Sequence, residues 1–293
     1  MPADRPVKTA ATPMGSTTMN NRMKLAISMS MAIIYTTGPR MTSRVARAAG
    51  PLLLAAAVLA GAPAQAACED PPAPRVLWIG CDFSGRDLRE ANLRGAVLMR
   101  TNLSGADLRG AILDGVDFTL GDLGQARLTE ARMVRANLVG TRLEGAELGQ
   151  VDLSNGRLDN ASLQGANLEG ARLSGASLYT TDLTGANLRG ADLSGANLSR
   201  ARLDGADLSG ANLSQARLER ASLEDANLRA ARLDRARLDN ASLLYADLRD
   251  TDLTRASLVN ARIDGARFDD AVLDSTLWVD RKRCRPDSRG HCN

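Results

Sequence analysis

A five-residue pattern of hydrophobic and polar positions runs through most of the chain. Every fifth residue from Phe83 to Leu273 is apolar, and these 39 positions hold 34 Leu, 3 Phe, 1 Met and 1 Ile. Two residues before each of them the chain carries Ala in 29 of the 39 repeats, and most of the exceptions are Thr, Gly or Val, with Arg86 the only charged one. No residue is inserted or deleted over this stretch, so the pattern predicts one continuous repeat architecture.

A period of five fits neither an α-helix nor a flat strand. In an α-helix, successive leucines would be rotated by about 140° from one another, which would bury the charged residues between them. A chain that turns a corner every five residues instead directs each Leu and each Ala toward one axis. Four such sides make a coil of about 20 residues, and coils stack at the strand spacing of about 4.8 Å. The pattern therefore predicts an all-β solenoid.

The repeats also resemble a known family. Residues 186–190, 191–195 and 196–200 read Ala-Asn-Leu-Arg-Gly, Ala-Asp-Leu-Ser-Gly and Ala-Asn-Leu-Ser-Arg, which resembles the A-(D/N)-L-x-x motif of the pentapeptide-repeat family. The resemblance implies a right-handed quadrilateral parallel β-helix of about ten coils, a rod about 45–50 Å long. In such a fold the leucine fills the axis, and glycine at the fifth position suits a turn with positive φ.

The two ends of the repeat carry residues that its middle lacks. Trp78 and Trp278 are the two tryptophans, and both lie in the five-residue register just outside the Leu positions. We expect them to cap the first and last coils, because a solenoid must cover its open ends. The chain then divides into an N-terminal cap segment at 67–80, the β-helix at 81–278 and a C-terminal disulfide cap at 279–293.

All four cysteines lie at these ends. Cys68 and Cys81 flank the start of the body, and Cys284 and Cys292 follow it. An even number of cysteines in an exported protein is typical of disulfides. Within the rod that the family resemblance implies, Cys68–Cys81 and Cys284–Cys292 are the pairs that do not cross the rod. Two alternatives stay open: free thiols, or a metal site of Cys284, His291 and Cys292. The tail also resembles the closing segment of exported pentapeptide-repeat proteins.

Residues 41–66 have the order of a secretory signal peptide. Two arginines precede an apolar run of about 13 residues, which is too short to cross a bilayer as a helix. A small-residue stretch that ends at Ala66 suits signal peptidase, and a buried Ala/Leu helix is the alternative interpretation. Residues 1–40 are then either upstream of a true start at Met41 or a disordered extension. The sequence predicts a periplasmic or secreted protein with no transmembrane span in its mature chain.

Charge is unevenly divided between the two parts. Residues 1–67 carry seven basic residues and one acid, a net charge of +6, whereas residues 68–293 carry 30 basic and 33 acidic residues, a net charge of −3. The basic balance therefore belongs to the N-terminal segment. The repeat region has no basic patch of the kind that binds nucleic acid, so we expect no nucleic-acid partner.

Residues 20 apart should stack on one face of the rod. One such series alternates in charge along the chain: Arg132, Asp152, Arg172, Asp192, Asn212, Arg232 and Asp252. We interpret it as a cross-coil salt-bridge ladder rather than a docking stripe.

A few apolar residues fall at outward-facing positions. Exposed aromatic side chains can anchor a partner, although scattered apolar residues on a surface are normal. The candidate surface contacts are Tyr179, Tyr245 and Leu244, and Tyr179 belongs to a 20-residue series with Met99, Val139 and Val259.

The sequence predicts no enzyme. The single His lies in the tail, no nucleophile has a paired base, and no phosphate-binding, dinucleotide or metal motif is present, so we expect no catalytic residue, cofactor or metal. The leading hypothesis is an exported structural or interaction scaffold whose partner is an unidentified protein. The alternative, which the family resemblance implies, is a cytosolic DNA mimic that modulates a type II topoisomerase. Capped ends favour a monomer over a homodimer.

Overall fold

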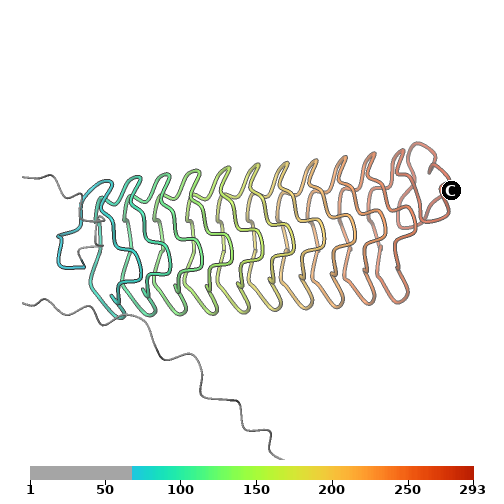
Figure 1. Ribbon diagram of the computed structural model, residues 1–293. Helices are drawn as coiled ribbons and strands as arrows, with labels where there is room; N and C mark the ends of the chain where they lie inside the picture. The colour runs from blue at the N-terminus through green and yellow to red at the C-terminus, as the bar shows by residue number, and fades with distance from the viewer. Residues whose placement is uncertain (1–67) are drawn as a thin grey trace, which may run out of the picture. The chain divides into compact units, whose positions relative to one another are not determined.

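The structure, a computed structural model, describes residues 68–293, and this part of the chain is a stack of four-sided coils (Figure 1). Each side of a coil is one five-residue repeat, and its second residue forms the bridge to the coils on either side. All bridges between coils are parallel and join residues 20 apart, from Leu77↔Val97 to Ser257↔Leu277. The 200 residues from Leu77 to Leu277 therefore make ten coils, in agreement with the number predicted from the sequence.

A tight turn at every fifth residue produces the corners. In one repeat, the N–H of Ala196 donates to the carbonyl oxygen of Leu193 at 3.0 Å, and Gly195 between them has a φ of 65°. This hydrogen bond and the single positive φ are those of a type II turn. The same turn forms where the fifth residue is not glycine, as at Arg200, whose φ is 61°.

The Asp or Asn at the second position of the motif supports the turn. The Asp192 side chain accepts a hydrogen bond from the backbone N–H of Ser194 at 3.1 Å, and Asn197 accepts one from Ser199 at 3.2 Å. Short polar side chains that bond the backbone two residues further on favour turns. The preference for Asp and Asn in the repeat therefore has a local structural cause.

Hydrogen bonds between coils satisfy the backbone. The N–H of Leu193 donates to Asn212 in the next coil at 2.7 Å, and that of Asp192 donates to Ala171 in the preceding coil at 2.9 Å. This arrangement repeats along the stack, so backbone groups that face the neighbouring coils find partners there.

The core is a solid column of side chains along the axis. Leucines of the central position, from Leu93 to Leu258, have exposed fractions of zero, and alanines of the first position line the same column. The column includes Val76 and Trp78, which occupy the small and central positions of a repeat and are buried. Within residues 68–293 the chain forms no helix that could cross a membrane.

Several buried threonines replace alanine at the first position. Thr181 donates its hydroxyl hydrogen to the carbonyl oxygen of Leu158 at 2.7 Å, and Thr141 donates to Phe118 at 2.9 Å. These two hydroxyls reach a carbonyl of the preceding coil, and that of Thr251 donates to Leu248 in its own turn at 2.6 Å, which offsets the cost of burying them. These exceptions to alanine preserve the fold.

Two adjacent alanines give a direct test of the turn geometry. Ala230 lies at a corner with a φ of 56°, whereas its neighbour Ala231 is buried in the column. A left-handed conformation costs a residue with a Cβ about 1–2 kcal/mol, so Ala230→Gly should stabilise the protein by about 1 kcal/mol. Ala231→Gly should destabilise it by at least about as much. Denaturant unfolding of the two variants measures both effects. If both substitutions changed the free energy of unfolding in the same direction, the assignment of Ala230 to a corner would be contradicted.

Candidate interaction surface

The surface of the rod has four faces and four corners, which the coil 201–220 defines. Faces 1 to 4 of this coil are residues 201–204, 206–209, 211–214 and 216–219. The first to fourth corners are Gly205, Gly210, Gln215 and Arg220. Other coils have the same faces and corners at residues displaced by multiples of 20. The second, fourth and fifth residues of each repeat are the ones whose side chains reach the surface.

The predicted charge series does lie along one face. Parallel bridges connect its members in order, from Arg132↔Asp152 to Arg232↔Asp252 on face 3. Only one ion pair within the series forms, between Arg172 and Asp152 at 4.0 Å. Arg132 instead pairs with Asp114 at 3.0 Å, because the long side chain reaches a fourth-position acid of the preceding coil. The 20-residue register is therefore confirmed, but most neighbours in the series do not form ion pairs with one another.

Pairs of Asp and Arg two residues apart form the closest ion pairs of the surface. Arg89 binds Asp87 through two hydrogen bonds, of 2.9 and 2.7 Å, and Arg249 binds Asp247 in the same way. The side-chain hydrogen bonds from Arg89 lower the pKa of Asp87 to about 2, and those from Arg249 lower the pKa of Asp247 to about 2 although partial burial opposes the shift. These carboxylates stay charged to low pH.

The lowered pKa values predict how stability depends on pH. A carboxyl whose pKa is lower in the folded than in the unfolded chain stabilises the fold above its unfolded pKa, and this contribution is lost as pH falls through the folded pKa. The free energy of unfolding should therefore be constant near neutrality and fall between about pH 4 and pH 2, where Asp87 and Asp247 become protonated. Guanidinium unfolding at several pH values measures it. The fall should be smaller in Asp247→Asn, and an equal fall would contradict this origin.

The C-terminal end is closed by a short segment that folds back along the last coil. Arg283 and Arg289 form antiparallel bridges to Leu277 and Val272. Cys284, which is 2% exposed, forms a disulfide with Cys292 across Cα atoms 4.9 Å apart. The cap therefore covers two of the four sides of the last coil with backbone hydrogen bonds, which protects part of the open edge.

The N-terminal end is held by the second disulfide. Cys68 joins Cys81 across Cα atoms 5.6 Å apart, and Cys81 is buried. These two pairs are the ones named from the sequence, and no cysteine remains free. The disulfide uses the sulfurs of Cys284 and Cys292, which leaves His291 without the ligands of the alternative metal site. Among residues 68–293, no group of three His, Cys, Asp or Glu is placed to hold a metal ion.

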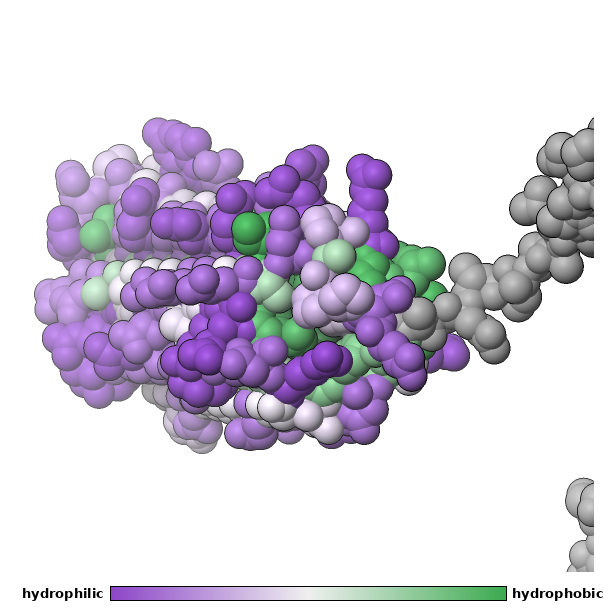
Figure 2. Space-filling view, turned by 90° about the vertical axis from the view of Figure 1, so that its left-hand side faces the viewer, coloured by the Kyte–Doolittle hydropathy of each residue, from purple (hydrophilic) through white to green (hydrophobic). Residues whose placement is uncertain are grey.

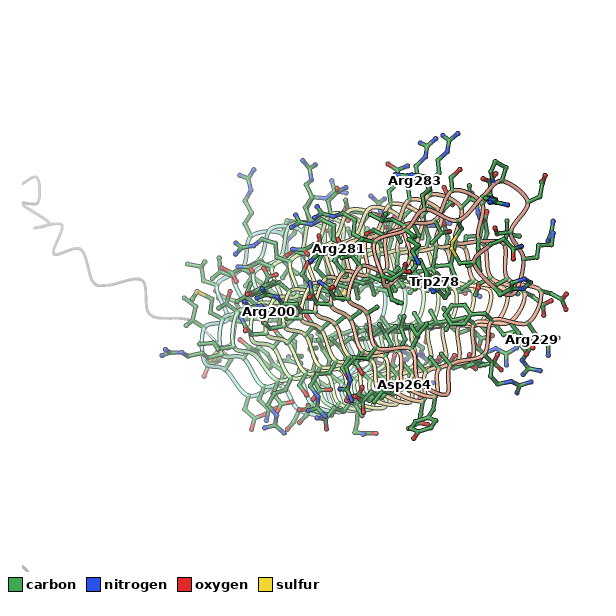
Figure 3. All side chains as sticks on the ribbon, turned by 90° about the vertical axis from the view of Figure 1, so that its right-hand side faces the viewer. Arg200, Arg229, Asp264, Trp278, Arg281 and Arg283 are labelled. Atoms are coloured by element: carbon green, nitrogen blue, oxygen red, sulfur yellow. A yellow bond between two sulfur atoms is a disulfide. The ribbon has the colours of Figure 1, made fainter. Side chains whose placement is uncertain are left out.

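Both tryptophans lie at the ends, in different surroundings. Trp78 is fully buried, with its ring centroid 4.3 Å from that of Phe83, and its indole N–H donates to the carbonyl oxygen of Asp70 at 3.2 Å. Trp278 is only partly buried and contacts Phe268 edge to face at 5.3 Å. Figure 3 shows Trp278 in the view onto the C-terminal end. Trp78 fills the axis, whereas Trp278 lies at the margin of the column.

The three candidate contact residues lie apart from one another. Tyr179 is on face 4, 37% exposed, with the Arg200 guanidinium 5.9 Å from its ring centroid. Tyr245 is at a first corner and 67% exposed, and its ring lies over Gly265 of the next coil. Leu244, next to it on face 1, is half-buried. The structure does not bring these three residues together into one patch.

Face 4 is the most apolar of the four faces. Leu77 and Ile79 are exposed at its N-terminal end, Val97 and Met99 follow in the next coil, and Tyr179 lies further along. Seen from the N-terminal end of the rod, most of the surface is hydrophilic and hydrophobic residues reach it in small areas (Figure 2). Face 4 therefore offers the best apolar contact area to a partner.

A polar hollow on the surface does not have the chemistry of an active site. It lies over Gly170 and is lined by Glu130, Arg132, Gln150, Asp152 and Arg172. No His or Cys lines it, and its charged residues are Arg132, Asp152 and Arg172 of the face 3 series and Glu130 of the second corner. The arrangement can hold ion pairs but offers no nucleophile with a base.

The fold and surface together define a β-solenoid with a filled apolar interior and a disulfide at each end. Its charged side chains lie on the surface. The protein-family model for pentapeptide repeats matches this chain with eight copies of the model. The matches cover residues 79–115, 117–155, 157–195, 181–220, 196–235 and 231–270. The chain belongs to the pentapeptide-repeat family, and its fold is the right-handed quadrilateral β-helix of that family.

Three solved structures illustrate the similarity. HetL, a pentapeptide repeat protein involved in heterocyst differentiation regulation from the cyanobacterium Nostoc sp. strain PCC 7120, is 34% identical with a TM-score of 0.54, over 69% of this chain and 92% of that one. A pentapeptide repeat protein from the Arabidopsis thaliana thylakoid lumen is 34% identical with a TM-score of 0.34, over 35% and 72%. Trypsin-treated QnrB1, a plasmid-mediated fluoroquinolone resistance protein, is 19% identical with a TM-score of 0.40, over 64% and 88%. No curated protein matches the sequence.

Proposed function

We propose that this protein is an exported, non-enzymatic scaffold that presents the surface of its rod to a macromolecular partner. The observation that carries the proposal is the solid column of leucines between two disulfide-closed ends. Since the interior is filled by side chains, binding has to use the faces and corners. Long, regular solenoid surfaces are suited to partners that are themselves extended.

The two disulfides support a localisation outside the cytosol. Structural disulfides persist in oxidising compartments and are rare in the cytosol. The signal peptide predicted at 41–66 agrees with this, although it lies outside the described residues. Periplasmic or secreted localisation is therefore part of the proposal, and the partner belongs to the same compartment.

Charge on the faces argues against the alternative, a DNA mimic. Such a mimic needs a continuous acidic face. Here every face carries arginines among its acids, for example Arg202 on face 1, Arg189 on face 2, Arg172 on face 3 and Arg217 on face 4. Inhibition of supercoiling by a type II topoisomerase should therefore be absent with the purified protein.

A photo-crosslinking experiment in the native cells tests the proposal. A photoreactive residue is placed at one exposed position per face: Tyr179 on face 4, Leu244 on face 1, Arg189 on face 2 and Arg172 on face 3. We expect a discrete adduct from the Tyr179 position, formed outside the cytosol and absent from at least one other face. Adducts with topoisomerase in the cytosol, or no adduct from any face, would overturn the proposal.

A further inference from the structure

The charged corner residues are sorted by sign around the rod. Between Arg75 and Asp270, every basic corner residue flanks face 4 and every acidic one flanks the opposite face 2. The basic ones are Arg75, Arg135, Arg235 and Arg255 at the third corner and Arg100, Arg200 and Arg220 at the fourth. The acidic ones are Glu90, Glu130, Asp250 and Asp270 at the second corner and Asp225 at the first. Figure 3, which looks onto the C-terminal end, shows Arg200 on one side and Arg229 of face 2 on the other.

These residues occupy positions that favour glycine. The seven corner arginines have φ values between 56° and 61°. Residues with a Cβ adopt this left-handed backbone conformation less readily than glycine does. All twelve are exposed, so they do not repay this cost by packing in the core. Within residues 68–293 none of the seven corner arginines forms an ion pair, whereas many arginines on the faces do. The corner arginines are thus available to a second molecule.

The charges of the third corner match those of the second corner in height along the rod. A coil of 20 residues rises about 4.8 Å, so the residue number measures height at about 0.24 Å per residue. Third-corner and second-corner charges then fall into four pairs, Arg75 with Glu90, Arg135 with Glu130, Arg235 with Asp250 and Arg255 with Asp270. In three pairs the acid lies about 3.6 Å further along the rod than the arginine, and in the pair of Arg135 and Glu130 it lies about 1.2 Å less far, all within the reach of these side chains.

The uncharged stretches match as well. No corner residue is charged between Arg135 and Arg235 at the third corner, or between Glu130 and Asp250 at the second. Both corners therefore carry charged residues toward the two ends of the rod and uncharged residues in its middle. At the remaining corners, Arg220 and Asp225 lie at nearly the same height.

We infer that the complementary partner of face 4 and its arginine corners is face 2 of a second copy of this chain, placed beside the first in parallel. A pure sideways translation brings the third corner of one rod to the second corner of its neighbour, and the fourth corner to the first. All four pairs then form at once, and the apolar strip of face 4 is covered. Since the two contacting faces differ, the contact repeats and makes an open sheet of rods.

The association is weak and depends on salt. Ion pairs between exposed side chains contribute little each and are screened by salt, and Asp250 already binds Arg229 at 3.1 Å. Rods should therefore associate at low ionic strength or at high local concentration. The capped ends oppose end-to-end stacking, whereas this contact uses the sides. The inference does not depend on export or on the identity of another partner.

Complementary charge reversal tests the arrangement. Sedimentation velocity of the oxidised protein should show association that rises with concentration at about 0.01 M salt and disappears at about 1 M. Arg235→Glu with Arg255→Glu should lower the association constant at least about tenfold, and so should Asp250→Lys with Asp270→Lys. An equimolar mixture of the two double variants should associate again, because each presents the corner that the other has lost. Arg132→Glu with Arg172→Glu on face 3 reverses as many charges and should leave association unchanged.

The outcomes separate this contact from other uses of the arginines. Circular dichroism and melting establish that each variant is folded, which is expected because all the changed side chains are exposed. A wild-type protein that stays monomeric at low salt, or a mixture that fails to restore association, would overturn the inference. Heparin binding that requires Arg235 and Arg255 in a protein that stays monomeric would assign the corners to a polyanion instead.

Discussion

Leu193→Ala is expected to lower the free energy of unfolding by about 2–5 kcal/mol. Leu193 is fully buried at the middle of the column, where the coils above and below it leave little freedom to close the cavity. In a repeat protein, stability is approximately a sum over repeats and their interfaces, so a defect in the middle weakens both neighbouring interfaces. Guanidinium unfolding followed by circular dichroism measures the change.

A nearby surface residue gives the matched control. Arg189 lies on face 2 of the same coil, its side chain is 61% exposed, and its one ion pair, with Asp207, is long at 3.9 Å. Arg189→Ala should therefore change stability by less than about 0.5 kcal/mol. If the two variants lost similar amounts of stability, the leucine column would not be the main source of stability.

Cys284→Ser with Cys292→Ser is expected to destabilise the C-terminal end by about 2.5 kcal/mol. The disulfide closes a loop with a sequence separation of 8, and the loss corresponds to the chain entropy that such a loop restricts. Without it the cap should detach from the last coil and expose the edge that Arg283 and Arg289 cover. The effect should be local, because distant coils do not contact the cap.

Hydrogen exchange separates this local effect from a global one. The amides of Leu273 and Gly290, which bond across the cap at 2.9 Å, should lose protection in the double variant. The amide of Leu193, in the middle of the rod, should keep it. Equal loss of protection at both places would contradict a stack of nearest-neighbour coils.

The coil architecture could be predicted from the sequence because its cause is repeated. The same turn bond and the same central leucine recur in each repeat, so one rule applied many times outweighs exceptions such as Thr181 and Gly156. Fold class, coil number and the face of the charge series all follow from the period of five and its multiple of 20.

The ends and the choice of ion pairs do not repeat and could not be predicted in this way. Arg283 and Arg289 return antiparallel to the last coil, and nothing in the period of the body indicates that direction. Arg132 selects Asp114 over the expected Asp152 because long side chains reach several acids of neighbouring repeats. Which acid is chosen depends on side-chain rotamers.

The sorting of the corner charges by sign is present in the sequence but is not visible as a motif. Charged residues at the fifth position, such as Arg235 and Asp250, look scattered when read in order along the chain. They separate by sign only when positions are grouped by the 20-residue coil.

The intact mass of the protein from native cells, measured by compartment with and without reduction, tests the account most directly. We predict a chain that begins near Ala67, lies outside the cytosol and gains the mass of four hydrogen atoms on reduction of its two disulfides. A full-length chain with free thiols in the cytosol would contradict the exported scaffold and favour the topoisomerase alternative.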